Sequence, residues 1–323
     1  MTYRHGARSA PILPRDLGTL PISARQGPGC RWRPNGSLST QRSPRCEPGA
    51  TVSSVHRGVG GVSVGVVDDE TRRSHGGAFD RAAGVYAASR PGYPRESAAW
   101  LAGTAAQRVL DLGAGTGAFT AVLVELGHEV TAAEPGEAML HELSTLAPRA
   151  SAVRACGERL PFTDASFDVV TVAGAFHWMD HELAVPELAR VLRPLGTLGF
   201  VYNTREEGTP LAAELTSVLT SVQPAGLEGD WGAGSVAALD GMAAMDGSEL
   251  FAPLEYGESR WSQRLDRDGL VGLVASRSYV INLDAVRRSD LLAATADLFD
   301  RHAGGPTTLD LPYVTQCWRA VRR

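Results

Sequence analysis

The residues best suited to chemistry form a glycine-rich stretch directly after a short apolar run. Residues 109–117 read VLDLGAGTG, so an expected strand passes into a turn that contains Gly113 and Gly115. Glycine permits a tight turn and a close approach of the backbone to a ligand. The pattern predicts a nucleotide-cofactor loop but leaves the cofactor open, because nicotinamide and flavin enzymes carry G-x-G-x-x-G at the same place.

Two carboxylates narrow the choice of cofactor. Asp111 stands at the end of the expected strand, where it would repel a pyrophosphate and would suit the ammonium and sulfonium of S-adenosylmethionine. Glu134 closes the next expected strand, about 20 residues beyond the loop, at the position where an acid accepts both ribose hydroxyls. The alternative for Glu134 is a solvated acid at a strand end.

The elements that must position these residues alternate between apolar runs and amphipathic segments, which predicts an α/β fold with a doubly wound parallel sheet. The expected strands are 108–112, 128–133, 150–155, 167–173 and 197–202. The expected helices between them are 117–126, 137–146 and 182–192. Further helices at 211–222, 267–274 and 286–299 predict a helical lid over about 205–305. Residues 307–321 are expected to form a closing hairpin that turns at Leu311-Pro312.

Residues 1–74 differ in composition from the rest of the chain. They are rich in Arg, Pro, Gly and Ser, and their apolar residues follow neither helical nor strand spacing, which predicts disorder. A basic arm or a transit peptide is the functional interpretation, although five prolines would interrupt a targeting helix. The favoured alternative is a segment without function, even translated upstream sequence. The folded domain is therefore expected over 75–323.

Composition argues against several classes of partner. The formal net charge of -5 provides no overall basic field for nucleic acid. Four cysteines without C-x-x-C spacing disfavour disulfides and a zinc site, so no metal is expected. No apolar run reaches the roughly 18 to 20 residues that span a bilayer. These features predict a cytoplasmic protein that uses neither membrane nor nucleic acid, and they leave the oligomeric state open.

Four longer stretches resemble class I S-adenosylmethionine-dependent methyltransferases, in particular the small-molecule branch with the trans-aconitate and ubiquinone/menaquinone-type methyltransferases. They are 79–94 (FDRAAGVYAASRPGYP), 109–119, 158–180 (ERLPFTDASFDVVTVAGAFHWMD) and 190–199 (RVLRPLGTLG). Residues 276–280 (SRSYV) also resemble the lid of this branch. The resemblance covers about 78–321 and implies a Rossmann-like, mostly parallel sheet with a C-terminal antiparallel hairpin and a helical lid. Leu195 departs from it, because a glycine is usual there.

The resemblance also implies residue roles around S-adenosyl-L-methionine. The methionine and ribose portions would be lined by Asp111, Gly113 and Gly115, with Glu134 on the ribose. The adenine would lie near Pro135, Met139, Cys156, Gly157 and Glu158. Cys156 departs from the acid often found there, so the backbone amide of Gly157 is the expected adenine contact.

A helix that precedes the first strand is implied to cover the cofactor. Tyr86 and Arg90 lie four residues apart and hence on one helical face. Arg90 could then pair with the methionine carboxylate, and the alternative is an ordinary surface charge.

The implied activity is methyl transfer to oxygen or carbon of a small molecule, with a carboxylate as one option. His177 and Trp178 follow the fourth strand at the ligand-binding edge of the sheet, where His177 could deprotonate the acceptor or only pack. Trp178 and Arg277 are the predicted acceptor contacts, although Arg277 could instead tie the lid to the sheet. Two alternatives stay open, a nicotinamide-dependent oxidoreductase and a non-catalytic S-adenosylmethionine-binding protein.

Overall fold

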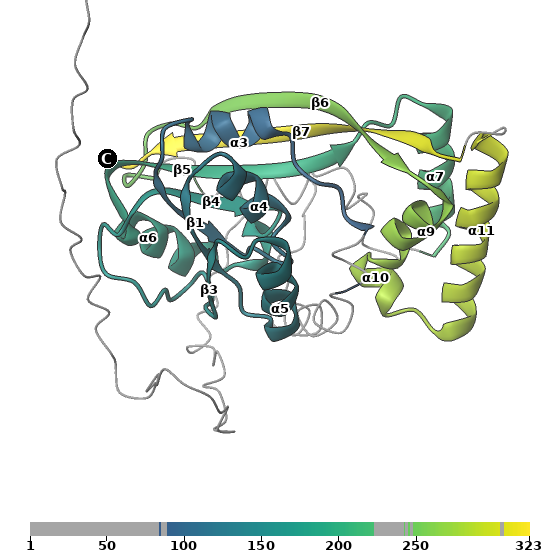
Figure 1. The fold of residues 1–323 in the computed structure, drawn as a ribbon, viewed down its shortest axis with the longest axis horizontal. Coiled ribbons are helices and arrows are strands. Elements are labelled where there is room, and N and C mark those ends of the chain that lie inside the picture. The colour runs from purple at the N-terminus through teal and green to yellow at the C-terminus, as the bar shows by residue number, and fades with distance from the viewer. Residues whose placement is uncertain (1–83, 85–88, 223–241, 243–244, 246–247, 304–306) are drawn as a thin grey trace, which may run out of the picture. The chain divides into compact units, whose positions relative to one another are not determined.

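A seven-stranded sheet in the order β3-β2-β1-β4-β5-β7-β6 organises the described chain (Figure 1). The computed structural model describes residues 84, 89–222, 242, 245, 248–303 and 307–323, all within the unit Thr40–Arg323. The strands are β1 (Arg108–Leu112), β2 (Glu129–Ala133), β3 (Ser151–Val153), β4 (Phe167–Ala173), β5 (Leu192–Arg205), β6 (Glu255–Leu265) and β7 (Leu309–Val321). β1 to β5 pair in parallel, and β7 runs antiparallel to both neighbours. The predicted Rossmann-like, mostly parallel sheet is confirmed.

Helices cover both faces of the parallel strands. They are α3 (Arg95–Ala102), α4 (Ala118–Glu125), α5 (Glu137–Leu146) and α6 (His181–Val191). One apolar cluster joins α6 to β1, β4 and β5, whereas a second joins α3 and α4 to the opposite side. The chain leaves β1 and β4 toward opposite neighbours, so their carboxyl ends form the switch point where open α/β sheets bind ligands.

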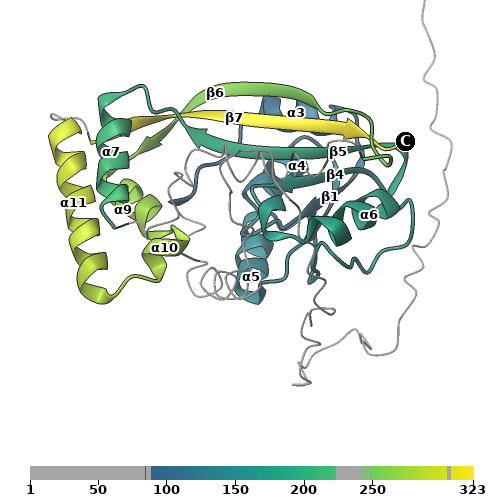
Figure 2. The same cartoon turned by 180° about the vertical axis from the view of Figure 1, so that it is seen from behind.

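Four further α-helices of the described residues gather beyond the carboxyl end of β5 (Figures 1 and 2). They are α7 (Pro210–Thr220), α9 (Arg267–Ala275), α10 (Ser278–Ile281) and α11 (Ala285–Ala303), and they share one apolar cluster. The predicted lid helices are therefore present. None of the helices in the described ranges is both long and apolar enough to cross a membrane.

Two expectations for the C-terminal third are wrong. The expected lid contains a sheet strand, β6, which the sequence hides because this edge strand carries charged and polar residues at most positions. Residues 309–321 form one continuous strand, and the hairpin-like pairing is made with β6 instead. Pro312 is tolerated because it lies beyond the last register pair of β5 with β7, Arg205 with Tyr313. There the Glu206 amide donates to the Pro312 carbonyl at 2.9 Å.

The backbone conformation at Leu195 explains why a glycine is usual at this position. Its φ is 61°, in the left-handed region, and 71% of the residue is exposed. Leu195→Gly should therefore stabilise the protein by about 1 kcal/mol, because glycine avoids the left-handed penalty and little packing is lost. The shift in melting temperature measures this, and a lower melting temperature in the variant would contradict the expectation.

Candidate cofactor and acceptor site

The glycine loop places its two central glycines in different surroundings. Gly113 has a φ of 65°, and a Cβ built on it would stand 2.5 Å from the Cβ of Ala175. Gly115 has a φ of 55°, but a Cβ built there would meet no heavy atom within 4 Å. Protein packing therefore requires a glycine at position 113. At Gly115 the backbone is open to the approach of a ligand.

Glu134 is bound to this open glycine. Its half-buried carboxylate accepts hydrogen bonds from the Gly115 amide at 3.0 Å and from the Gly136 amide at 2.9 Å. Each carboxylate oxygen has more than one acceptor position, so these two bonds leave capacity for hydroxyl donors. The end of β2 thus supplies an acceptor-only group beside the accessible backbone of the loop.

Asp111 lies below the loop rather than on its open side. The residue is fully buried and accepts hydrogen bonds from the hydroxyls of Thr120 at 2.6 Å and Thr171 at 3.0 Å. Burial raises the pKa of Asp111 to about 6, the two hydroxyls oppose this rise, and the charge of Glu134 adds to it. The carboxylate therefore links β1 to α4 and β4, and it would act on a charged cofactor through its field.

The residues predicted near the adenine differ in how far they are exposed to solvent. Pro135 is exposed directly after Glu134, and Cys156 is half-buried. Gly157 is buried where a Cβ would stand 2.6 Å from the Met179 sulfur. Met139 is only 4% exposed, so its side chain packs on the buried face of α5.

Glu158 has a partner on another segment. Its Oε1 accepts the Asp180 amide at 2.9 Å, which ties the segment after β3 to the start of α6. A structural role for this carboxylate is thus visible in addition to the predicted place near the adenine.

His177 lies in a short 3₁₀ helix, η1 (Phe176–Trp178), just beyond β4. Burial and the neighbouring His181 lower the pKa of His177 to about 4, so the imidazole is neutral near pH 7. Its ring centroid is 4.7 Å from that of Trp178 and 6.1 Å from that of Tyr202. The neutral imidazole can accept a proton without first losing one, but its lowered pKa also makes it a weaker base than an ordinary histidine.

Tyr202 was not predicted as a site residue. It is 4% exposed at the carboxyl end of the parallel part of β5, and burial raises its pKa. The backbone of His177 and of Phe176 approaches its hydroxyl and opposes this rise in pKa. An aromatic residue at the end of an apolar strand is typical of a core position, so the sequence offered no signal for it.

The structure brings Arg90 and Arg277 to the same place. Nη2 of Arg90 donates to the Ser276 carbonyl at 3.3 Å, and the next residue, Arg277, is 8% exposed at the start of α10. The interaction of Arg90 with the lid is thus visible, whereas its predicted pairing with a methionine carboxylate stays a prediction. Tyr86 lies outside the described residues, so its place on the same helical face stays untested.

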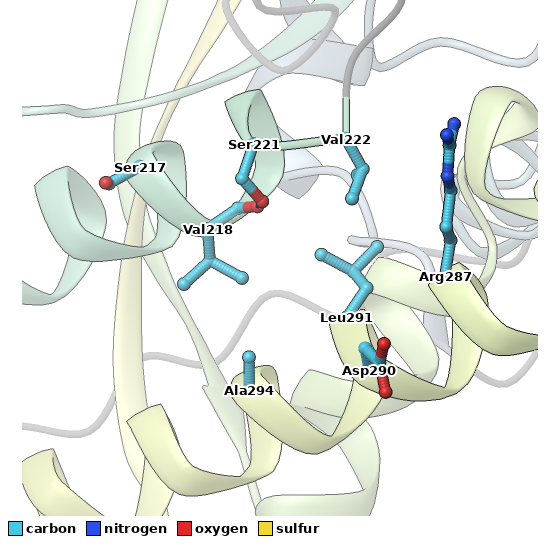
Figure 3. Close-up of a pocket in the computed structure, with 8 residues that line it drawn as sticks. All are labelled: Ser217, Val218, Ser221, Val222, Arg287, Asp290, Leu291 and Ala294. Atoms are coloured by element: carbon cyan, nitrogen blue, oxygen red, sulfur yellow. The ribbon is translucent and has the colours of Figure 1, made fainter.

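A surface cavity of about 450 Å³ lies elsewhere, between α7 and α11 (Figure 3). Its lining includes Val218 of α7 and Leu291 of α11, together with Arg287 and Asp290 of α11. None of the predicted site residues lines it. The described residues also contain no group of three or more His, Cys, Asp or Glu side chains that could hold a metal.

Comparison with known proteins agrees with this geometry. Residues 110–200 match the family model of a methyltransferase domain. An uncharacterized methyltransferase of Mycobacterium tuberculosis is 40% identical over 253 residues, which cover 78% of this chain and 98% of that relative. A demethylmenaquinone methyltransferase of Clavibacter sepedonicus is 40% identical over 102 residues, 30% of this chain and 42% of the relative.

A solved structure assigned as a type II methyltransferase, from Anaeromyxobacter dehalogenans, superposes with a TM-score of 0.50 at 27% identity. The match covers 72% of this chain and 97% of that one. The chain therefore belongs to the methyltransferase family, in the class I S-adenosylmethionine-dependent group, and it is an enzyme of methyl transfer. The oxidoreductase alternative is set aside.

Proposed function

We propose that this enzyme transfers the methyl group of S-adenosyl-L-methionine to oxygen or carbon of a small-molecule acceptor. The observation that carries the proposal is the pairing of the Glu134 carboxylate with the open backbone of Gly115 at 3.0 Å. An acceptor-only acid beside accessible backbone fits an adenosyl group, whose ribose presents two adjacent hydroxyl donors. When bound, the sulfonium supplies both the activated methyl group and the leaving group.

The proposed cofactor contacts follow the carboxyl ends of the strands. Glu134 binds the ribose hydroxyls, and the accessible backbone at Gly115 faces the methionine and ribose portions. The Gly157 amide faces the adenine edge, with Pro135 and Cys156 beside it. Asp111 contributes a negative field from below, and Arg90 approaches from the segment that precedes α3.

The proposed acceptor site lies at η1. Alignment of acceptor and methyl group can supply about 7 to 11 kcal/mol of the barrier, so the chain needs no nucleophile of its own. For a phenol or carbon acid, neutral His177 accepts the proton, with Trp178 as an apolar wall. For a carboxylate acceptor no base is required, and Arg277 is the proposed counter-charge. The demethylmenaquinone methyltransferase matches over only 42% of its length, so we do not propose its acceptor for this enzyme.

We also propose that residues 1–74 lie outside the methyltransferase domain, which spans 75–323. In support, 253 aligned residues account for 98% of the M. tuberculosis relative. The lid over about 205–305 is proposed to shape the acceptor site, because its helices stand beyond the carboxyl end of β5.

Glu134→Ala tests the cofactor site. The variant should bind S-adenosyl-L-methionine more weakly by about 1.5 to 3 kcal/mol, the range for hydrogen bonds to a charged group. Isothermal calorimetry measures the change. Glu137→Ala is the matched control, because Glu137 is an exposed acid three residues further along the chain that pairs with Arg154 at 3.4 Å. Equal affinities for wild type and the Glu134 variant would exclude the ribose assignment.

A further inference from the structure

Residues 89–93 pass near the carboxyl ends of β4 and β5 before the chain enters α3. The Tyr93 ring packs edge-on against Phe119 of α4 at 5.0 Å between centroids. Its hydroxyl lies 3.7 Å from the point where a Cβ of Gly174 would stand, directly after β4. At the other end of the segment, Arg90 bonds the Ser276 carbonyl at the end of α9. The segment therefore connects the lid helices with the start of α4.

Strands β5 and β6 each hold this segment through one side chain. Nε2 of Gln263 in β6 donates to the Ser89 carbonyl at 3.4 Å. Nδ2 of Asn203 in β5 donates to the Gly92 carbonyl at 2.8 Å. The bond from Asn203 is the shorter of the two, and it holds the end of the segment that leads into α3.

Asn203 is itself oriented by a buried relay. The Trp261 indole donates to Oγ1 of Thr315 at 2.8 Å, and the Thr315 hydroxyl donates to Oδ1 of Asn203 at 2.6 Å. Thr315 is fully buried in β7, between the strands that carry its two partners.

The direction of every bond in this relay is fixed. The Gly92 carbonyl can only accept, so Asn203 must turn Nδ2 toward it and Oδ1 toward Thr315. The Thr315 hydroxyl must then donate to Oδ1, and its oxygen accepts from the Trp261 indole, which can only donate. A donor at one end and an acceptor at the other thus select one orientation of the Asn203 amide.

We propose that Thr315 and Asn203 are positioning residues for cofactor binding: their relay fixes the Gly92 backbone, and with it Arg90 and Tyr93, over the glycine loop. The inference rests on the proposed function of that loop. Thr315 acts without contact to the cofactor, from a strand that joins the sheet only near the end of the chain.

Thr315→Val tests the relay, because valine keeps the shape of threonine and removes its hydroxyl. Calorimetry should show roughly 3- to 10-fold weaker binding of S-adenosyl-L-methionine, the factor that corresponds to about one neutral hydrogen bond. Amide hydrogen exchange of residues 89–98 should become faster in the cofactor-free variant. Thr315→Ser keeps the hydroxyl and should restore both values.

Asn203→Asp tests the direction of the relay. Aspartate still accepts from Thr315, but it turns a carboxylate oxygen toward the Gly92 carbonyl, so binding should weaken at least as much as in Thr315→Val. Thr204→Val is the matched control. Thr204 follows Asn203 in β5, and its hydroxyl donates at 3.0 Å to Gln316, which follows Thr315 in β7. None of its described hydrogen bonds involves residues 89–93.

Three outcomes distinguish the positioning role of Thr315 from a role in stability alone and from a wrong assignment of the glycine-loop site. Weaker binding and faster exchange in Thr315→Val, with both unchanged in Thr204→Val, support the relay. A lower melting temperature with normal affinity and exchange in Thr315→Val assigns Thr315 to stability alone and overturns the inference, provided that Glu134→Ala still weakens binding. Normal affinity in both the Thr315 and Glu134 variants would overturn the glycine-loop site and the inference together.

Discussion

Gly113→Ala should lower the free energy of unfolding by about 2 to 5 kcal/mol. A φ of 65° costs a non-glycine residue about 1 to 2 kcal/mol. The new methyl group would stand 2.5 Å from the Cβ of Ala175, so η1 or the loop must move, which typically costs about 1 to 3 kcal/mol. Urea unfolding of the cofactor-free protein measures the loss.

Gly115→Ala is the matched variant with a different expected result. The same kind of backbone penalty applies at its φ of 55°, but the methyl group meets nothing within 4 Å, so the stability loss should stay near 1 kcal/mol. Affinity for S-adenosyl-L-methionine should fall at least about 10-fold, because the methyl group fills the side proposed to face the cofactor. Wild-type stability of Gly113→Ala would contradict the packing argument. Normal affinity of Gly115→Ala would show that its open side faces elsewhere.

The contrast between these two glycines shows what the sequence can and cannot predict. Local pattern located the loop, because a strand that runs into closely spaced glycines and then a helix has few other interpretations. The helix over 137–146 and the strand over 167–173 were likewise predicted with the observed bounds, since the helix is amphipathic and the strand is an apolar, β-branched run. Which glycine is packed and which is open depends on Ala175, some 60 residues away in sequence.

The missed features are non-local in the same way. β6 carries few apolar residues because it is an edge strand, so periodicity gave no signal for it. The buried position of Asp111 depends on Thr171, 60 residues further along the chain. The relay joins Asn203 to Thr315 across 112 residues, and no spacing rule in one sequence connects them.

Asp111→Asn should make the protein more stable than wild type near neutral pH, by up to about 3 kcal/mol. Wild type must keep a fully buried carboxyl charged above its folded pKa of about 6, compared with 3.8 for an ordinary aspartate. A difference of about two pKa units corresponds to about 3 kcal/mol. Asparagine avoids this cost and can keep both hydroxyl partners, because Thr171 also reaches the Leu110 carbonyl at 3.5 Å.

The sign of the pH dependence follows from proton linkage. Between pH 4 and 6 the folded wild type binds more protons at Asp111 than the unfolded chain does, so stability from this group falls as pH rises. Its contribution is fully present below about pH 4 and is lost above about pH 6. The stability difference between Asp111→Asn and wild type should therefore grow across this interval and level off above it. Urea unfolding at several pH values measures it, and a difference that is constant with pH would refute the buried titration.

Cofactor affinity should change in the opposite direction to stability. At pH 8 the charged Asp111 provides a negative field below the loop, which favours the sulfonium and ammonium of S-adenosyl-L-methionine, so the asparagine variant should bind more weakly. As pH falls below about 6, wild type loses this charge and its affinity should approach that of the variant. A wild-type carboxylate that lowers stability and raises affinity would then be retained for binding, as expected where function needs a destabilised group. Equal affinities at pH 8 would reduce Asp111 to a link between β1, α4 and β4.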